Sequence, residues 1–161
     1  MMKTIYIWSL IMTIPLFGSM IDYNKNKEFC LPDEVEVVQD SIIIQDSSLV
    51  YSLIQVESAG KDSCVGDKHL VIPSVGCLQI RPIMVREVNR ILKGLGNTTR
   101  FKNKDRWSRK KSIQMFYVWK NFHHMKSTNE KIARNWNGGP RGYKRKRTVQ
   151  YWTKVQKELN K

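Results

Sequence analysis

The chain has 161 residues, of which 41% are hydrophobic and 26% are charged. This length suffices for one domain with a hydrophobic core, and the composition excludes general disorder, a collagen-like repeat and a multi-span membrane protein. The formal net charge of +14 indicates an anionic partner or surface, such as nucleic acid, lipid headgroups or bacterial wall polymers.

Residues 1–20 have the layout of a secretory signal peptide. Lys3 gives a positive start, a mostly apolar run follows over residues 5–17, and small residues come next. The run is shorter than a membrane span of about 20 residues, and Pro15 interrupts it. We therefore expect export to the periplasm, the cell envelope or the medium, with no membrane span after signal removal. An uncleaved anchor and an N-terminal helix of the fold are the alternatives.

The charge changes sign along the rest of the chain. Residues 22–48 contain seven acidic and two basic residues, whereas residues 49–161 contain 25 basic and 7 acidic residues, a net charge of +18. We therefore predict an acidic N-terminal extension over residues 21–46 and one basic domain over residues 47–161. The extension is a linker or folds back on the basic domain, unless residues 42–44 form a short strand.

Apolar residues recur at helical spacing in five segments of the basic domain. Start signals at Ser47 or Ser48, Pro82, Ser108 and Thr128 precede four of them. The apolar stripes are, in chain order, Leu49, Val50, Leu53 and Ile54; Met84, Val88, Ile91 and Leu92; Met115, Trp119 and Phe122; Ile132, Ala133 and Trp136; and Trp152, Val155 and Leu159. We expect a mainly α domain of about five or more helices, with a small irregular or β element after the first.

Glu57 is the strongest candidate for a catalytic residue. It follows Ile54 and Leu53 by three and four positions, so it shares their face at the end of the first helix. Burial and the negative end of the helix dipole both favour the protonated acid, which is the form a general acid needs near neutral pH. The alternative is a partly exposed glutamate that falls on this face by chance.

Glu57 also opens an ordered set of four motifs. Glu57-Ser58-Ala59-Gly60 is followed by Gly76-Cys77-Leu78-Gln79-Ile80, by residues 133–140 with the sequence Ala-Arg-Asn-Trp-Asn-Gly-Gly-Pro, and by a tyrosine at position 151. Over roughly residues 47–155 this set resembles the soluble lytic transglycosylases and the related goose-type lysozymes. Those families have Glu-Ser, then Gly-x-x-Gln, then Tyr-Asn-x-Gly-Pro, then a tyrosine in the last helix. The resemblance implies a lysozyme-like domain in which Glu57 is the catalytic acid.

Several residues near these motifs have the chemistry to bind a glycan. Gln79 and Asn137 are neutral amides that can hold sugar groups without competing for the catalytic proton, although both can equally cap loops. Trp136 replaces the tyrosine of the family motif, and it either stacks on a sugar ring or packs in the core. Tyr117 or Tyr151 must then supply any hydroxyl near the acid. We expect Gln79, Asn137 and Tyr151 to line the substrate groove, with Asp67 as a further candidate.

The type of reaction depends on a second carboxylate. Asp67 lies in the long loop between Glu57 and Gln79, in the Gly-Asp context that in goose-type lysozymes belongs to an aspartate positioning the attacking water. A hydrolase needs such a group, whereas a lytic transglycosylase uses the 6-hydroxyl of its own substrate. However, Arg81 stands where those lysozymes tend to carry another aspartate. Alternatively, Asp67 is an exposed loop residue with no role in the reaction.

We therefore expect a lytic transglycosylase that cleaves the β-1,4 bond between N-acetylmuramic acid and N-acetylglucosamine in peptidoglycan, with Glu57 as its single acid/base. The alternatives are a hydrolytic lysozyme that uses Asp67, a basic nucleic-acid-binding protein and a catalytically inactive wall-binding module. The expected partners are glycan strands and anionic wall polymers, with no nucleic acid, metal or cofactor. The protein is exported or, alternatively, part of a bacterial virus particle.

Two further features have open interpretations. Cys64 and Cys77 bracket the loop after Glu57, so in an exported protein they form a disulfide that leaves Cys30 unpaired, or they remain free buried thiols. A dense basic run near the C-terminus is either a solvated face or a contact for anionic wall polymers or glycan carboxylates. It consists of Arg141, Lys144, Arg145, Lys146 and Arg147.

Overall fold

The computed structural model describes residues 40–161, with side chains described from residue 47 onward. The signal peptide expected over residues 1–20 lies outside the described residues, as do Cys30 and most of the extension expected over residues 21–46. The elements that follow are α1 (Asp40–Ser58), α2 (Pro82–Gly94), the 3-10 helix η1 (Asn103–Trp107), α3 (Arg109–His124), α4 (Asn129–Gly138), the 3-10 helix η2 (Gly142–Lys144) and α5 (Arg147–Leu159).

The prediction of a mainly α fold with about five helices is confirmed. The described part of the chain contains no β-strand, and its β structure consists of isolated bridges from Val75 to Val65 and Ile80 in the connection after α1. No helix within residues 40–161 is long and apolar enough to cross a membrane.

Three of the predicted helix starts are confirmed. Pro82 occupies the first turn of α2, where its missing N–H costs nothing. Ser108 caps α3 by accepting a hydrogen bond from the backbone N–H of Lys111 at 3.5 Å, and Thr128 caps α4 by accepting one from Lys131 at 3.3 Å. Side-chain oxygens thus satisfy backbone donors that the helices themselves leave unpaired.

The predicted start of the first helix is wrong. α1 begins at Asp40, so Ser47 and Ser48 lie inside it and neither caps its N-terminus. The strand considered for residues 42–44 is helical as well. Serine is tolerated inside a helix when its hydroxyl bonds to a carbonyl one turn earlier, as Ser52 Oγ does to the Ser48 carbonyl at 2.8 Å.

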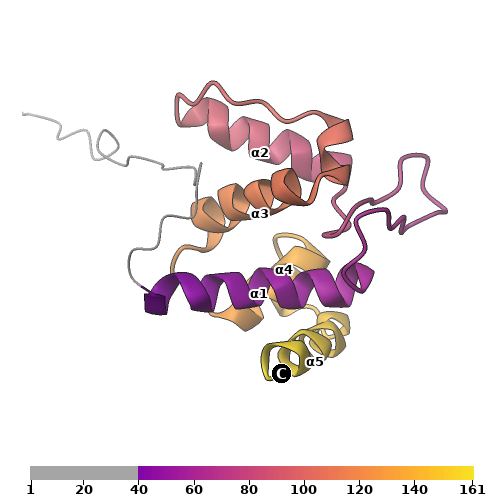
Figure 1. The fold of residues 1–161 in the computed structure, drawn as a ribbon, viewed down its shortest axis with the longest axis vertical. Coiled ribbons are helices and arrows are strands. Elements are labelled where there is room, and N and C mark those ends of the chain that lie inside the picture. The colour runs from indigo at the N-terminus through magenta and orange to yellow at the C-terminus, as the bar shows by residue number, and fades with distance from the viewer. Residues whose placement is uncertain (1–39) are drawn as a thin grey trace, which may run out of the picture. The chain divides into compact units, whose positions relative to one another are not determined.

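The core forms where the predicted apolar stripes meet. α1 packs against α5, α5 against α4, and α2 against α3 (Figure 1). The buried side chains include Leu49, Val50, Leu53 and Ile54 of α1, Val88, Ile91 and Leu92 of α2, Met115, Phe116 and Trp119 of α3, Ile132 and Ala133 of α4, and Val155 of α5. Phe122 is the exception to its predicted stripe: it is 48% exposed, and the Arg90 guanidinium lies over its ring at 5.7 Å from the centroid.

The long connection between α1 and α2 is fastened to η1. Arg106 of η1 is buried and donates hydrogen bonds from Nη1 to the carbonyl oxygens of Pro73 and Ile80, each at 3.0 Å. Gly76 lies against the same helix with φ +80°, and a Cβ at this position would stand 2.0 Å from the Arg106 carbonyl oxygen. Only glycine combines this left-handed backbone with so close an approach.

Candidate active site

Glu57 lies in the last turn of α1, and the packing of α1 against α5 places Tyr151 beside it. The Tyr151 hydroxyl donates a hydrogen bond to Oε1 of Glu57 at 2.7 Å. The two residues are 94 positions apart in the sequence. Of the two tyrosines expected to supply a hydroxyl near the acid, Tyr151 does so. Tyr117 packs edge-on against Phe116.

The environment of Glu57 keeps its carboxyl protonated at a higher pH than is usual for a glutamate. Burial raises its pKa from 4.5 to about 7; the hydrogen bond from Tyr151 lowers the pKa, and the negative charge of Asp67 raises it. Burial also raises the pKa of Tyr151 well above 10, as does the adjacent carboxylate, so this hydroxyl remains a donor at neutral pH. A carboxyl that is protonated near pH 7 is suited to general acid catalysis.

Asp67 is close enough to Glu57 for its charge to act on that carboxyl. Its side chain is exposed, and its backbone adopts the left-handed region with φ +45°. The Asp67 carbonyl accepts a hydrogen bond from the Leu70 N–H at 2.9 Å, which closes a turn here. Aspartate tolerates this conformation better than most residues do. The structure thus brings Glu57, Tyr151 and Asp67 into one electrostatic group.

Gln79, predicted to bind sugar groups, braces its own loop. Its Nε2 donates to the carbonyls of Cys64 at 3.1 Å and Gly76 at 2.8 Å, and its Oε1 accepts from Ser74 Oγ at 3.1 Å. A Cβ at Gly66 would stand 2.2 Å from the same Oε1, so the loop closes tightly around the amide. Both amide hydrogens of Gln79 are engaged within the loop. These contacts fit the alternative interpretation of Gln79, in which its amide caps loop backbone groups.

Trp136 and Asn137 lie at the end of α4. The Trp136 ring is partly buried and packs edge-on against Phe116 and Trp119, with 5.2 Å between ring centroids in both pairs. Asn137 is exposed. No hydrogen bond or ring contact within the described residues joins either side chain to Glu57. The packing of Trp136 is that of a residue at the edge of the core.

Three residues that the sequence pattern did not mark as important, Arg134, Asn135 and Thr148, anchor the segment between α4 and α5. Arg134 is buried and donates from Nε to Thr148 Oγ1 at 3.0 Å, and from Nη2 to the Tyr143 carbonyl at 2.5 Å. Its Nη1 pairs with Oε1 of Glu130 at 2.6 Å. Asn135 Oδ1 accepts a hydrogen bond from the Tyr143 N–H at 2.7 Å. The spacing of Glu130 and Arg134, one helical turn, was the available signal for this anchor.

The two cysteines of the domain carry free thiols in the structure, with Cys64 partly buried and Cys77 buried. Burial raises the pKa of the Cys77 thiol. Within the described part of the chain, no group of three or more His, Cys, Asp or Glu side chains comes close enough to hold a metal ion.

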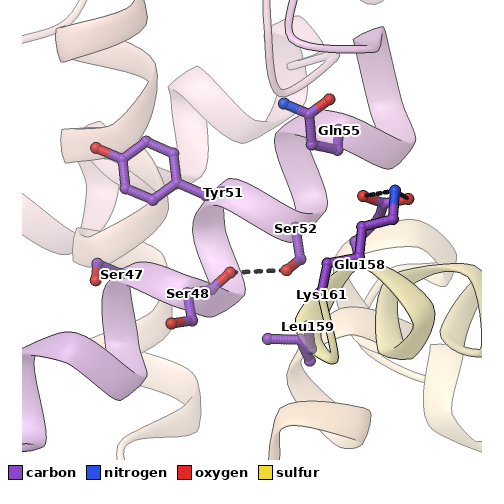
Figure 2. Close-up of a pocket in the computed structure, with 8 residues that line it drawn as sticks. All are labelled: Ser47, Ser48, Tyr51, Ser52, Gln55, Glu158, Leu159 and Lys161. Carbon is purple, nitrogen blue, oxygen red and sulfur yellow. Dashed lines mark hydrogen bonds and ion pairs between the residues drawn. The ribbon is translucent and has the colours of Figure 1, made fainter.

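A separate groove of about 330 Å³ lies between α1 and the end of α5. Figure 2 shows its mostly polar lining, in which Ser52 bonds to the Ser48 carbonyl and Lys161 pairs with Glu158 at 2.7 Å. The residues that line it are Ser47, Ser48, Tyr51, Ser52, Gln55, Glu158, Leu159 and Lys161. None of the predicted site residues is among them, so the groove is distinct from the Glu57–Tyr151 pair.

The sequence matches no protein-family model and no curated protein. The assignment of the site therefore depends on its residues and their geometry.

Proposed function

We propose that this protein is a lytic transglycosylase that cleaves the β-1,4 bond between N-acetylmuramic acid and N-acetylglucosamine in peptidoglycan. The observation that carries the proposal is the Glu57 carboxyl, whose pKa burial raises to about 7 and which Tyr151 holds by a 2.7 Å hydrogen bond. The order of the four motifs around Glu57 supports the same reaction. The protein acts outside the cytoplasm, as an exported enzyme or, alternatively, as part of a bacterial virus particle.

The first chemical step is the transfer of the Glu57 proton to the glycosidic oxygen, while the anomeric carbon develops oxocarbenium character. Because Tyr151 occupies Oε1, the proton that is transferred belongs on Oε2. The same hydrogen bond stabilises the carboxylate that the transfer leaves behind. Tyr151 thus orients the Glu57 carboxyl and stabilises its deprotonated form.

The second step returns the proton. The Glu57 carboxylate accepts the hydrogen of the muramic acid 6-hydroxyl as that oxygen attacks the anomeric carbon, which leaves a 1,6-anhydro end. The substrate supplies the nucleophile, so one carboxyl group is enough. The reaction needs no metal or cofactor.

A hydrolytic lysozyme is the second candidate, because the charge of Asp67 reaches Glu57. A direct-displacement hydrolase places its second carboxylate about 6.5–9.5 Å from the acid, with a water between them. An exposed aspartate whose charge acts on Glu57 fits such a role. Arg81, in place of a further aspartate, favours the transglycosylase.

Nucleic-acid binding remains the rival from another class, since the basic domain has a net charge of +18. Binding to a phosphate backbone gives no reason to keep a carboxyl protonated at the centre of the site. The Glu57–Tyr151 pair therefore favours an acid-catalysed reaction.

Mass spectrometry of muropeptides tests the proposal. Purified protein is incubated with isolated peptidoglycan, and we expect products with 1,6-anhydro ends from the parent and none from Glu57→Gln. Glu158→Gln, which alters a carboxylate in a surface ion pair at the far end of α5, is the matched control and should retain activity. Activity of Glu57→Gln within about tenfold of the parent would exclude Glu57 as the acid, since this role contributes about 10²–10⁴-fold. The absence of glycan products from a folded parent would refute the enzyme itself.

A further inference from the structure

Residues 141–147, here called the cationic loop, contain five positive side chains within seven positions. They are Arg141, Lys144, Arg145, Lys146 and Arg147. All five are exposed, and none forms an ion pair or side-chain hydrogen bond with a residue that the structure describes. Elsewhere in the domain, cations such as Arg90, Arg109 and Lys111 are paired with acidic side chains.

The backbone of the cationic loop is held firmly despite the repulsion between its charges. Thr148 Oγ1 donates to the carbonyls of Gly142 and Arg145, both at 2.7 Å, and accepts from Arg134 Nε. Gly142 packs so closely on α4 that a Cβ there would stand 2.0 Å from the Arg134 carbonyl oxygen. The Arg134 guanidinium also lies 4.6 Å from the centroid of the Tyr143 ring. The contacts below the loop fix its path, so its five cations are presented together.

The cationic loop leads directly to the candidate active site. Arg147 begins α5, and Tyr151, the partner of Glu57, follows one helical turn later on the same face. The four positions from Arg147 to Tyr151 correspond to a rise of about 6 Å along the helix, at about 1.5 Å per residue. A glycan strand bound for cleavage at Glu57 therefore passes near the end of the loop.

We propose that the cationic loop binds the carboxylates on the peptide stems of the same glycan strand that the enzyme cleaves, an inference that rests on the proposed function. Three of the five cations are arginines, whose planar guanidinium matches a carboxylate with two parallel hydrogen bonds. The stems recur along the strand, so carboxylates arrive at the loop whenever a bond reaches Glu57. A separate phosphodiester polymer has no such link to the bond being cut.

Binding to isolated walls tests this proposal independently of cleavage, because all proteins carry Glu57→Gln. The loop variant is Arg145→Gln, Lys146→Gln and Arg147→Gln. The control removes three exposed charges elsewhere, by Arg86→Gln, Lys93→Gln and Lys126→Gln. Three wall preparations are compared by co-sedimentation over a salt series: untreated walls, walls freed of phosphodiester polymers, and the latter with their carboxylates converted to amides.

We expect the loop variant to bind the first two preparations on the order of 10- to 100-fold more weakly than its Glu57→Gln parent. The control should lose less than about threefold. On amidated walls the parent and the loop variant should bind alike, and the advantage of the parent on the other walls should shrink as salt is raised.

Three results would overturn the proposal. The first is a loss confined to walls that retain phosphodiester polymers, which would identify those polymers as the ligand. The second is an equal loss in the control, and the third is a loop-dependent affinity for double-stranded DNA that exceeds the affinity for walls. Loop-dependent binding to carboxylates by a protein whose wild-type form yields no glycan products would uphold the binding site and refute only the proposed reaction.

Discussion

Tyr151 of α5 donates its phenolic hydrogen to Oε1 of Glu57 at the end of α1, across 2.7 Å. This bond favours the ionised carboxylate, whereas burial, the larger influence, favours the neutral acid. The balance leaves a pKa of about 7, near which an acid can both give and accept a proton during one catalytic cycle. The hydrogen bond from Tyr151 therefore both orients the Glu57 carboxyl and influences its pKa.

Tyr151→Phe should move the alkaline decline of activity to higher pH. The phenolic hydrogen bond lowers the Glu57 pKa, so its removal raises that pKa further. The rate should also fall, because the acid loses its orientation. The measurement is kcat/KM against pH on soluble glycan fragments, with the exposed Tyr51→Phe as the control. A decline that stays in place or moves to lower pH would show that Tyr151 does not bind the ionised form.

Glu57→Gln should stabilise the protein at alkaline pH. The folded-state pKa of about 7 lies above the ordinary glutamate value of 4.5, so between these pH values the folded protein keeps a proton that the unfolded chain releases. The stability from this group is fully present below pH 4.5 and is lost as the pH rises through 7. Glutamine cannot ionise, and the variant should gain up to about 3 kcal/mol over the parent by pH 8.

Urea unfolding at pH 4.5 and pH 8 measures this difference without reference to activity. Glu158→Gln, which alters a carboxylate in a surface ion pair at the far end of α5, is the control. A Glu57→Gln variant that is less stable than the parent at both pH values would mean that Glu57 is not held in its neutral form.

Arg134→Met should destabilise the domain by about 2–4 kcal/mol, because it removes the hydrogen bonds that Arg134 donates to the Thr148 hydroxyl and the Tyr143 carbonyl, together with the buried charge opposite Glu130. Lys131→Met, an exposed change on the same helix, should cost less than about 0.5 kcal/mol. Chemical denaturation compares the two. Equal losses would mean that the Arg134 hydrogen bonds do not hold the segment before α5.

The parts of the fold that were predictable from the sequence are those that a few neighbouring residues determine. Pro82, Ser108 and Thr128 each mark a helix start with chemistry confined to one turn. The phase of Leu53 and Ile54 likewise placed the neighbouring Glu57 towards the interior. The start of α1 was not predictable in this way, because serine, although favoured at an N-cap, is also tolerated inside a helix.

The contacts of the site were predictable only in part, because they join segments that are far apart in the sequence. Tyr151 was among the candidates, but its choice over Tyr117 required the packing of α1 on α5. Gln79 fits a sugar-binding motif, and only the folded loop shows its amide engaged by Cys64 and Gly76. Arginine is a residue type usually found at the surface, and the hydrophobic periodicity of the sequence gives no sign that the Arg134 side chain is buried.

Asp67→Asn separates the two proposed reactions. The change removes a negative charge that raises the Glu57 pKa, so in either case the alkaline decline of activity should move to lower pH. A transglycosylase takes its nucleophile from the substrate, and the maximal rate should then change little. If Asp67 positions a hydrolytic water, the rate should fall about 10²-fold or more, which is the usual effect of losing a positioned base.

The products of the parent enzyme complete this test. Transglycosylation leaves 1,6-anhydro ends, whereas hydrolysis adds one water and gives reducing ends that are heavier by about 18 Da. We expect anhydro ends and an active Asp67→Asn variant, because Glu57 and Tyr151 form the acid without help from Asp67, whose exposed side chain acts on Glu57 by its charge. Asp67→Glu, which keeps the charge, should then restore the parental pH profile. Reducing ends from the parent together with an inactive Asp67→Asn variant would make the protein a lysozyme, with Asp67 as its second carboxylate.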